Sequence, residues 1–218
     1  MRTKEETIAA LKQLDSADSL SHPAGLPKAA VLVPLFMKDG QVHTLMTRRA
    51  KQLRTSGGEV CFPGGKKDPG DEDDVGTALR EAKEEIGLPA GQVEVVCRLF
   101  PLVSKNGLLV TPVVGFIDEP FSPSPNPAEV SSVFSVPLEF FTSGKGHRAL
   151  NAASWMHSFH FADPHSGETF HIWGLTAMIA IMVAAFACRK KPEFEIGFDI
   201  HDPVPFFQWN LQRQMSKL

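Results

Sequence analysis

The chain has 218 residues, enough for one domain with its own core and few for two. Lysine and arginine number 22 against 25 aspartate and glutamate residues, and the formal net charge of -3 argues against a nucleic-acid-binding surface. The three cysteines are far apart and form no CxxC pair, so we expect free thiols in a reducing compartment and neither disulfides nor zinc. Residues 1–14 lack the long apolar core of a secretory signal.

The first predicted elements are a helix and a strand hairpin. Residues 4–14 have an amphipathic pattern, and a linker rich in Ser, Pro and Gly follows. Extended patterns over 29–36 and 41–48 flank Lys38-Asp39-Gly40, a sequence typical of a hairpin turn. A short strand predicted over 58–62 then leads into a glycine turn.

The next predicted element is a helix from about Val75 to Gly87, where the glycine suits a left-handed C-terminal cap. Glu81, Glu84 and Glu85 stand at i, i+3 and i+4 and share one face, at a cost of roughly 0.2–0.5 kcal/mol for each like-charged pair on an exposed helix. The helix dipole adds to this cost near the C-terminal end. A solvated charged face is one interpretation. The glycine turn just before the helix favours the other, a hard divalent cation held by carboxylates.

The second half of the chain alternates strands with one apolar helix. We expect a hairpin over 92–103 and 108–117, a loop over 119–128, a strand over 130–137, a helical turn over 138–141 and a second hairpin over 155–161 and 169–173. The apolar helix predicted over 175–188 is shorter than the roughly 20 residues that span a bilayer, so we interpret it as a core helix and expect no membrane span. The tail from Pro192 has no predicted element.

The predicted helix carries a known pattern. Gly65, an acidic spacer and Arg80-Glu81-Ala82-Lys83-Glu84-Glu85-Ile86-Gly87-Leu88 resemble the Nudix box, which here occupies about 65–88. The loop is one residue longer than the common box, so the acidic position before the helix falls on Asp71 when counted from Gly65 and on Glu72 when counted back from Arg80. The helical part of the pattern is unaffected.

The segment before the box narrows the resemblance. Leu45-Met46-Thr47-Arg48-Arg49-Ala50, Arg54, Gly58 and Phe62-Pro63-Gly64-Gly65 resemble the signature of the coenzyme A diphosphatase branch, with Met46 in place of the usual Leu. The resemblance implies an α/β Nudix fold, a mixed β-sheet sandwiched between α-helices. We expect an N-terminal helix and linker over 1–27, the Nudix domain over 28–191 and a C-terminal extension over 192–218.

The resemblance also implies an activity. A member of this branch would cut the pyrophosphate of coenzyme A (CoA) and acyl-CoA thioesters to 3′,5′-ADP and (acyl-)4′-phosphopantetheine, with Mg²⁺ or Mn²⁺ as cofactor. Two alternatives stay open: a diphosphatase acting on NADH or another dinucleotide, and an inactive Nudix module that binds nucleotides. The complete glutamate set argues against the inactive module, because a module without a cation has no need of this costly cluster.

Candidate residues follow from the box. We expect Glu81 and Glu85 to be the principal metal ligands, with Glu84 as a ligand or as the holder of a bound water, and Arg80 to orient these carboxylates. The carbonyl of Gly65 completes the expected ligand set. Glu81 and Glu129 are the two candidates for the general base, and Glu129 has an equally good interpretation as a surface residue before a strand.

The basic residues near the glycine turn are candidates for the anionic substrate, because guanidinium groups grip phosphate in a bidentate manner. Arg49 and Arg54 lie in the branch signature and are favoured, followed by Arg48 and Lys66. We interpret Lys51 and Lys67 as solubilising charge. The histidines at 157, 160, 165 and 171 fit no standard zinc spacing and are interpreted as exposed or structural.

The sequence ends with Ser216-Lys217-Leu218, a tripeptide that import receptors read as a peroxisomal address. We therefore expect a peroxisomal protein that regulates CoA levels there, with the import receptor as a protein partner and CoA and acyl-CoA as small-molecule partners.

Overall fold

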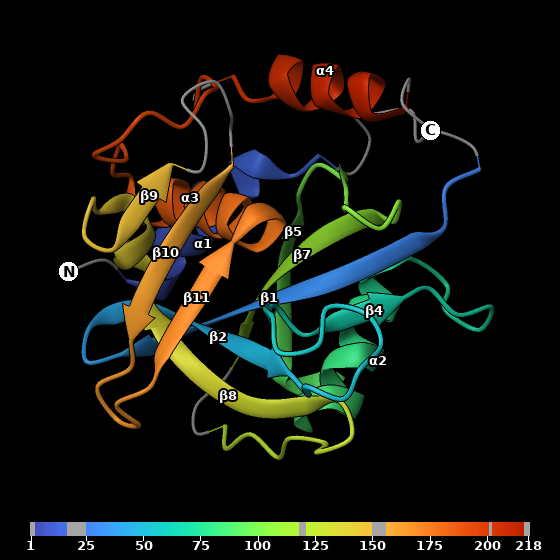
Figure 1. Ribbon diagram of the computed structural model, residues 1–218. Coiled ribbons are helices and arrows are strands. Elements are labelled where there is room, and N and C mark those ends of the chain that lie inside the picture. The colour runs from blue at the N-terminus through green and yellow to red at the C-terminus, as the bar shows by residue number, and fades with distance from the viewer. Residues whose placement is uncertain (1–2, 17–24, 118–120, 150–155, 201, 216–218) are drawn as a thin grey trace.

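The computed structural model describes residues 3–16, 25–117, 121–149, 156–200 and 202–215. A mixed sheet forms the centre, with helices on both faces (Figure 1). The sheet has eight strands in this part of the chain: β1 (Lys28–Lys38), β2 (Gln41–Arg49), β3 (Val60–Cys61), β4 (Gly64–Lys66), β5 (Val93–Arg98), β6 (Leu102–Val103), β7 (Leu109–Ile117) and β8 (Val130–Pro137). The central pair, β1 and β7, is parallel, and the other pairs are antiparallel.

The other elements lie around this sheet. The helices are α1 (Lys4–Leu11), α2 (Asp74–Ile86), α3 (Gly174–Cys188) and α4 (Val204–Met215), and short 3-10 turns cover Lys12–Leu14, Ala90–Gln92 and Leu138–Thr142. A second, antiparallel sheet contains β9 (His147–Ala149), β10 (His157–Ala162) and β11 (Thr169–Trp173). The expected fold class, a mixed sheet between helices, is confirmed.

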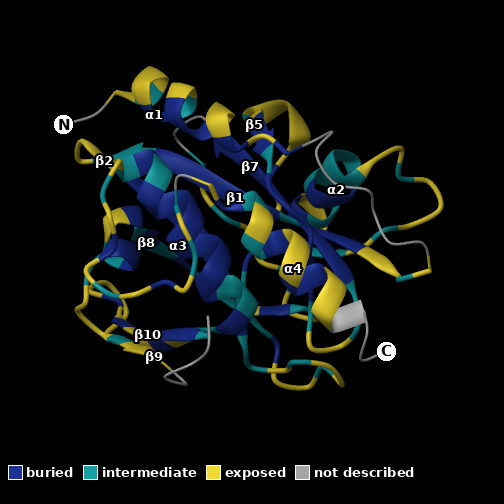
Figure 2. Cartoon of the chain, turned by 90° about the horizontal axis from the view of Figure 1, so that it is seen from above, coloured by how far each residue is buried: buried dark blue, intermediate teal, exposed yellow. Residues whose placement is uncertain are grey.

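Two apolar clusters hold the layers together. Ala78, Ala82 and Ile86 of α2 pack with Leu32 and Leu45 on one face of the sheet. The larger cluster lies on the other face and contains most of α3, which is almost wholly buried (Figure 2). Part of α1 and of α4 joins that larger cluster. An apolar helix buried nearly all round is a core helix.

Several predicted bounds change in the structure. The first helix stops at Leu11 and continues as a 3-10 turn. The strand predicted over 92–103 is interrupted between β5 and β6, where Pro101 has no N–H to give to a strand ladder. The strand predicted over 58–62 contains only the two residues of β3. Trp155, which begins a predicted strand, lies outside the described residues.

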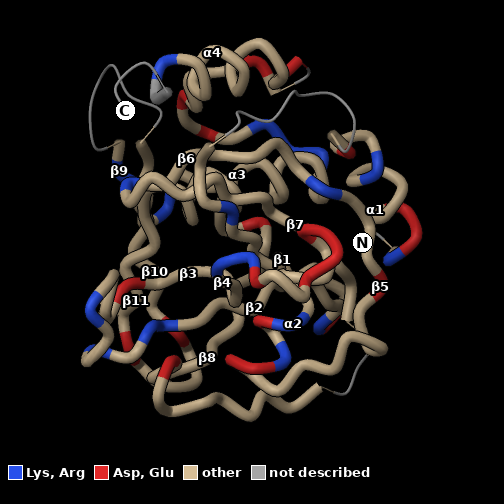
Figure 3. The backbone as a smooth tube through the Cα atoms, turned by 90° about the vertical axis from the view of Figure 1, so that its right-hand side faces the viewer, with Lys and Arg blue, Asp and Glu red and all other residues tan. Residues whose placement is uncertain are grey.

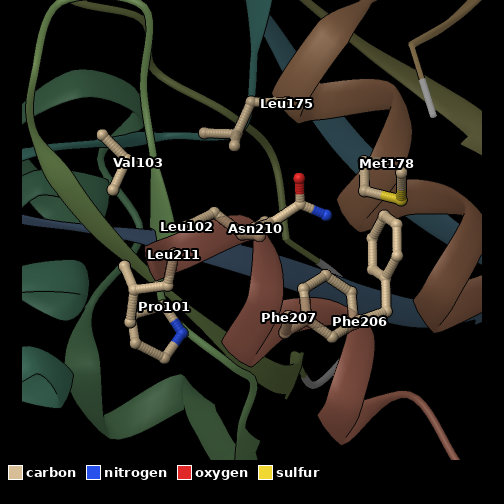
Figure 4. A pocket seen from close by; sticks show the side chains of 9 residues that line it. All are labelled: Pro101, Leu102, Val103, Leu175, Met178, Phe206, Phe207, Asn210 and Leu211. Carbon is tan, nitrogen blue, oxygen red and sulfur yellow. The ribbon is translucent and has the colours of Figure 1, made fainter. Parts of the chain in front are cut away.

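The structure also has elements that were not predicted: strands β4 and β9, the 3-10 turn over Ala90–Gln92 and helix α4. Helix α4 begins with Val204-Pro205, and its Phe207 and Leu211 are buried against the rest of the molecule. A small apolar cavity of about 10 Å³ lies between α4, β6 and α3, with the Asn210 amide among apolar side chains (Figure 4). That volume holds about one water molecule and no substrate group. The domain bounds at 28 and 191 stay a prediction.

The state of the cysteines and the absence of a membrane-spanning helix were both predicted from the sequence. Cys61, Cys97 and Cys188 are all free thiols. Burial raises the pKa of Cys61 to about 11, so this thiol stays protonated near neutral pH. Within the described ranges, none of the helices combines the length and the apolar character needed to cross a membrane.

Candidate metal centre and active site

Helix α2 presents its carboxylates to the glycine turn. The helix begins after Asp73, whose side chain accepts a hydrogen bond from the Gly76 N–H at 2.8 Å. It ends at Gly87, which has a φ of 74° and caps it in the left-handed conformation. Because the apolar face with Ala82 and Ile86 packs on the sheet, the neighbouring face with the acidic side chains turns toward β4.

A loop far along the sequence closes the C-terminal end of α2. Ser124 N–H donates to the Ile86 carbonyl and Asn126 N–H donates to the Glu85 carbonyl, both at 2.9 Å. These bonds satisfy carbonyl groups that a helix leaves free at its end. The loop continues into Glu129, whose side chain is thereby brought to the α2 carboxylates.

Glu81, Glu85 and Glu129 form one cluster, with one oxygen atom from each lying within 4.8 Å of the others. Glu85 is 1% exposed and accepts a hydrogen bond from the Gly64 N–H at 3.1 Å. Burial raises the pKa of Glu85 to about 7, and it also raises the pKa of Glu81. A buried carboxylate with two partly buried ones beside it matches the oxygen ligands of a hard divalent cation.

Arg80 joins the box loop to this cluster. Its Nη1 donates to Glu81 at 3.0 Å and to Glu84 at 3.1 Å, and its Nη2 donates to the Lys66 carbonyl at 3.0 Å. The remaining donors bind the Asp71 carboxylate. Arg80 therefore ties the loop, β4 and the helix together.

In the loop that is one residue longer than the common box, Asp71 is the acidic residue that lies at Arg80. Thr77 Oγ1 also donates to Asp71, at 2.9 Å, and Asp71 accepts from the Asp68 N–H at the same distance. Glu72 is exposed, and its carbonyl accepts from Lys67 Nζ at 3.2 Å. The acidic position that the sequence left open between these two residues is thus filled by Asp71, as a partner of Arg80.

Of the two remaining expected ligands, Glu84 lies outside the carboxylate cluster and Gly65 lies against it. The Glu84 side chain is 53% exposed and lies outside the group formed by Glu81, Glu85 and Glu129. A Cβ atom on Gly65 would lie 2.4 Å from the carboxyl carbon of Glu81. The backbone at Gly65 thus lies directly against a carboxylate, in space that any other residue would fill.

Of the four basic candidates, one lies at the carboxylate cluster, one pairs elsewhere and two are exposed. Arg49 Nη1 lies 3.7 Å from Glu85, and its buried Nε has no hydrogen-bond partner among the described residues. Arg48 donates to Ser131 Oγ at 3.2 Å and pairs with Glu168 at 3.2 Å, away from the carboxylates. Arg54 and Lys66 are exposed. Basic and acidic segments lie close together around β4 and α2 (Figure 3).

The NUDIX domain model matches residues 26–159. The chain belongs to the Nudix hydrolase family. It is 43% identical over 206 residues to a peroxisomal coenzyme A diphosphatase of Mus musculus, covering 92% of this chain and 87% of that protein. It is 39% identical over 208 residues to a mitochondrial Nudix hydrolase of Arabidopsis thaliana, covering 89% of this chain and 73% of the relative. A MutT/nudix family protein from Enterococcus faecalis has a TM-score of 0.48 at 16% identity, covering 98% of this chain and 94% of the other.

Family membership makes this Nudix hydrolase a metal-dependent pyrophosphohydrolase. The box helix carried the signal for this in the sequence. The contribution of the loop at 124–126 carried no such signal, because its hydrogen bonds to α2 join residues about 40 positions apart. Glu129 was a candidate base from the sequence, but the sequence did not place its carboxylate within 4.8 Å of those of Glu81 and Glu85.

Proposed function

We propose that this Nudix hydrolase cleaves the pyrophosphate bond of CoA and acyl-CoA thioesters, releasing 3′,5′-ADP and (acyl-)4′-phosphopantetheine. The observation that carries the proposal is the joining of two sequence segments. Arg49, from the segment that resembles the coenzyme A diphosphatase branch, lies 3.7 Å from Glu85 of the box. The name of the mouse relative supports the same substrate class.

Glu81 and Glu85 hold Mg²⁺ or Mn²⁺ in this proposal, with the Gly65 carbonyl as a further ligand. The mutually close carboxylates, with that of Glu81 directly against the Gly65 backbone, fit such an ion. A divalent cation neutralises the charge of the diphosphate and acidifies water. Arg80 positions Glu81, and the exposed Glu84 orients water at the edge of the site.

Glu129 is our choice for the general base. It lies within 4.8 Å of both Glu81 and Glu85, and its carboxylate accepts from the Asn126 side chain at 3.3 Å. Glu81 instead accepts from Arg80 Nη1 at 3.0 Å and is assigned to the cation, so both of its roles in this proposal are already taken. Glu129 takes a proton from the attacking water as the new P–O bond forms and the bridging P–O bond breaks.

Arg49 and Arg54 grip the substrate phosphates in this proposal, with Arg48 and Lys66 as further contacts. Arg49 is half-buried beside Glu85 and points a guanidinium group toward the place where the diphosphate would lie. Guanidinium groups suit this task because they bind phosphate oxygens in pairs.

We also propose a peroxisomal location. The tripeptide Ser216-Lys217-Leu218 lies outside the described residues, and its match to the receptor-read address supports import. The name of the mouse relative agrees with this location. A tagged protein lacking Leu218 should be diffuse in the cytosol, and peroxisomal puncta from that variant would contradict the proposal.

The test is a direct comparison of CoA, several acyl-CoA thioesters and NADH in the presence of Mg²⁺ or Mn²⁺. Release of 3′,5′-ADP from CoA, abolished by a chelator and by Glu85→Gln, supports the proposal. Preferential cleavage of NADH would make the chain a dinucleotide diphosphatase. Failure to cleave any of these compounds, with either ion, would leave a nucleotide-binding module and overturn the proposal.

A further inference from the structure

A cleft opens between β11 and the loop that joins β2 to β3. It holds about 270 Å³ and is lined by Arg48, Lys51, Glu59, Phe170, His171 and Trp173, among others. Ligand pockets commonly measure about 300–1,000 Å³, so this cleft suits one end of a large substrate. None of the candidate metal ligands lines it.

One wall of the cleft is aromatic. Along β11, Phe170 and Ile172 are buried, while His171 is exposed and Trp173 is half-buried. The His171 and Trp173 rings are stacked at 6.3 Å with an interplanar angle of 14°, and the His160 ring stacks on His171 at 4.7 Å. The exposed His171 and the half-buried Trp173 thus form an aromatic wall that a nucleobase can contact.

The opposite wall is basic. The Arg48 guanidinium carbon lies 5.3 Å from the centre of the Phe170 ring, and this arginine pairs with Glu168. Lys51 makes no hydrogen bond or ion pair with the part of the chain that the structure describes. Its place depends on the tight loop that follows, because a Cβ atom on Gly57 would lie 2.7 Å from the Lys51 carbonyl oxygen.

The charges around the cleft favour an anion. Lys105 Nζ lies 5.0 Å from the centre of the Trp173 ring and pairs with Glu59. Glu59 and Glu168 are therefore already neutralised by Lys105 and Arg48. Lys51 supplies the remaining positive charge, and a phosphate group is an anion that an ammonium group binds well.

The cleft is joined to the carboxylate cluster by two consecutive residues of β2. Arg48 lines the cleft, and Arg49 lies at Glu85. Their Cα atoms are about 3.8 Å apart, as in any trans peptide. The pairing of β2 with β8 shifts register between these two residues, so the regular alternation of side chains is broken at the place where one substrate would join the cleft to the cluster.

We propose that this cleft binds the 3′-phosphoadenosine end of the substrate, with the adenine against the Trp173–His171 stack and the 3′-phosphate at Lys51. This inference rests on the proposed CoA diphosphatase function. It also revises the interpretation of Lys51 as solubilising charge. Because NADH and 3′-dephospho-CoA lack a 3′-phosphate, Lys51 is a specificity-determining residue for CoA.

The test uses the full chain and the probe 3′,5′-ADP, which needs no hydrolysis to bind. Isothermal titration should show about tenfold weaker binding for Lys51→Ala, which loses a charge-assisted contact, and for Trp173→Leu, which loses stacking. Lys12→Ala and Trp209→Leu change the same residue types outside the cleft and should bind as the wild type does. Thermal melts establish that each variant is folded.

Steady-state kinetics with CoA and 3′-dephospho-CoA then isolate the contribution of the 3′-phosphate to binding. Lys51→Ala should raise the KM for CoA about tenfold with little change in kcat, and should leave the KM for 3′-dephospho-CoA unchanged. Trp173→Leu should raise the KM for both compounds. If CoA is hydrolysed and both variants keep the wild-type KM and the wild-type affinity for 3′,5′-ADP, the cleft assignment is wrong while the proposed function stands. If CoA is not hydrolysed, the titration still decides the cleft.

Discussion

Arg80 donates to both oxygens of the Asp71 carboxylate, from Nε and from Nη2, each at 2.9 Å. The Asp71 side chain is 6% exposed, and the hydrogen bonds from Arg80 hold the pKa of Asp71 well below its usual range. This bidentate pair fixes the plane of the guanidinium group. The Nη1 group of Arg80 is thereby directed at Glu81 and Glu84. The loop residue Asp71 thus sets the orientation of carboxylates on the helix.

Asp71→Asn should lower kcat/KM by roughly 10–100-fold, the usual cost of losing a group that orients metal ligands. Asparagine has the same shape but cannot pair as an anion with the arginine. Glu72→Gln is the matched control and should retain wild-type activity, because the Glu72 side chain makes no contact with Arg80 among the described hydrogen bonds and ion pairs. Equal losses in the two variants would contradict the assignment of Asp71.

The contrast between these two residues shows how far the sequence alone could predict the site. The spacing of Arg80, Glu81 and Glu85 on a capped helix was visible, because these contacts are local. The choice between Asp71 and Glu72 depended on the path of a seven-residue acidic loop, which spacing does not determine. The position of Glu129 depended on hydrogen bonds between a loop and the end of α2, which are not local at all.

The elements of the fold show the same contrast between local and distant contacts. Elements with strong alternation or a long apolar run, such as β8 and α3, agree with the prediction to within one residue. Helix α4 was missed because its sequence begins with Val204-Pro205-Phe206-Phe207 and its burial depends on contacts with β6 and α3. The role proposed for Lys51 could not be predicted for a similar reason, because its surroundings come from β11, more than 100 residues away.

Gly65→Ala should reduce activity by about tenfold or more, while the protein stays folded. The added Cβ atom would lie 2.4 Å from the Glu81 carboxyl carbon, so this carboxylate has to move out of the ligand position. Gly70→Ala is the control, because a Cβ atom there has no heavy atom within 4 Å. Activity and Mg²⁺ affinity measured for both variants test the prediction. Wild-type metal affinity in Gly65→Ala would count against the placement of the ligands.

Glu85→Gln and Glu129→Gln should separate metal binding from proton transfer. Glu85→Gln should lose both divalent-cation affinity and activity. Glu129→Gln should keep most of the cation affinity and lose about 10²–10⁴-fold in kcat, the usual contribution of a general base. Titration with Mn²⁺ and single-turnover rates measure the two effects. If Glu129→Gln lost cation affinity as fully as Glu85→Gln, Glu129 would be a ligand and the base would have to be sought elsewhere.

A pair of histidines holds the segment between α3 and α4. His147 Nε2 lies 3.0 Å from His157 Nδ1, and the His147 ring stacks on Phe194 at 3.6 Å. Burial lowers the pKa of both histidines, and the charge on a protonated His157 further lowers the pKa of His147. The neutral pair therefore fits the fold better than the protonated pair.

Folding stability should fall as the pH drops below the ordinary histidine pKa of about 6.5. When the folded-state pKa lies below the unfolded-state pKa, the unfolded chain binds more protons in that interval, so the stabilisation is complete above the unfolded value and is lost as the pH falls through the folded one. Thermal melts at about pH 7.5 and about pH 5.5 measure the loss. His147→Phe keeps the stacking on Phe194 and should reduce the acid-induced fall in Tm without abolishing it, because burial also lowers the pKa of His43, His157 and His171. His165→Gln removes an exposed ring and should show the full wild-type fall, whereas an undiminished fall in His147→Phe would place the acid sensitivity elsewhere in the chain.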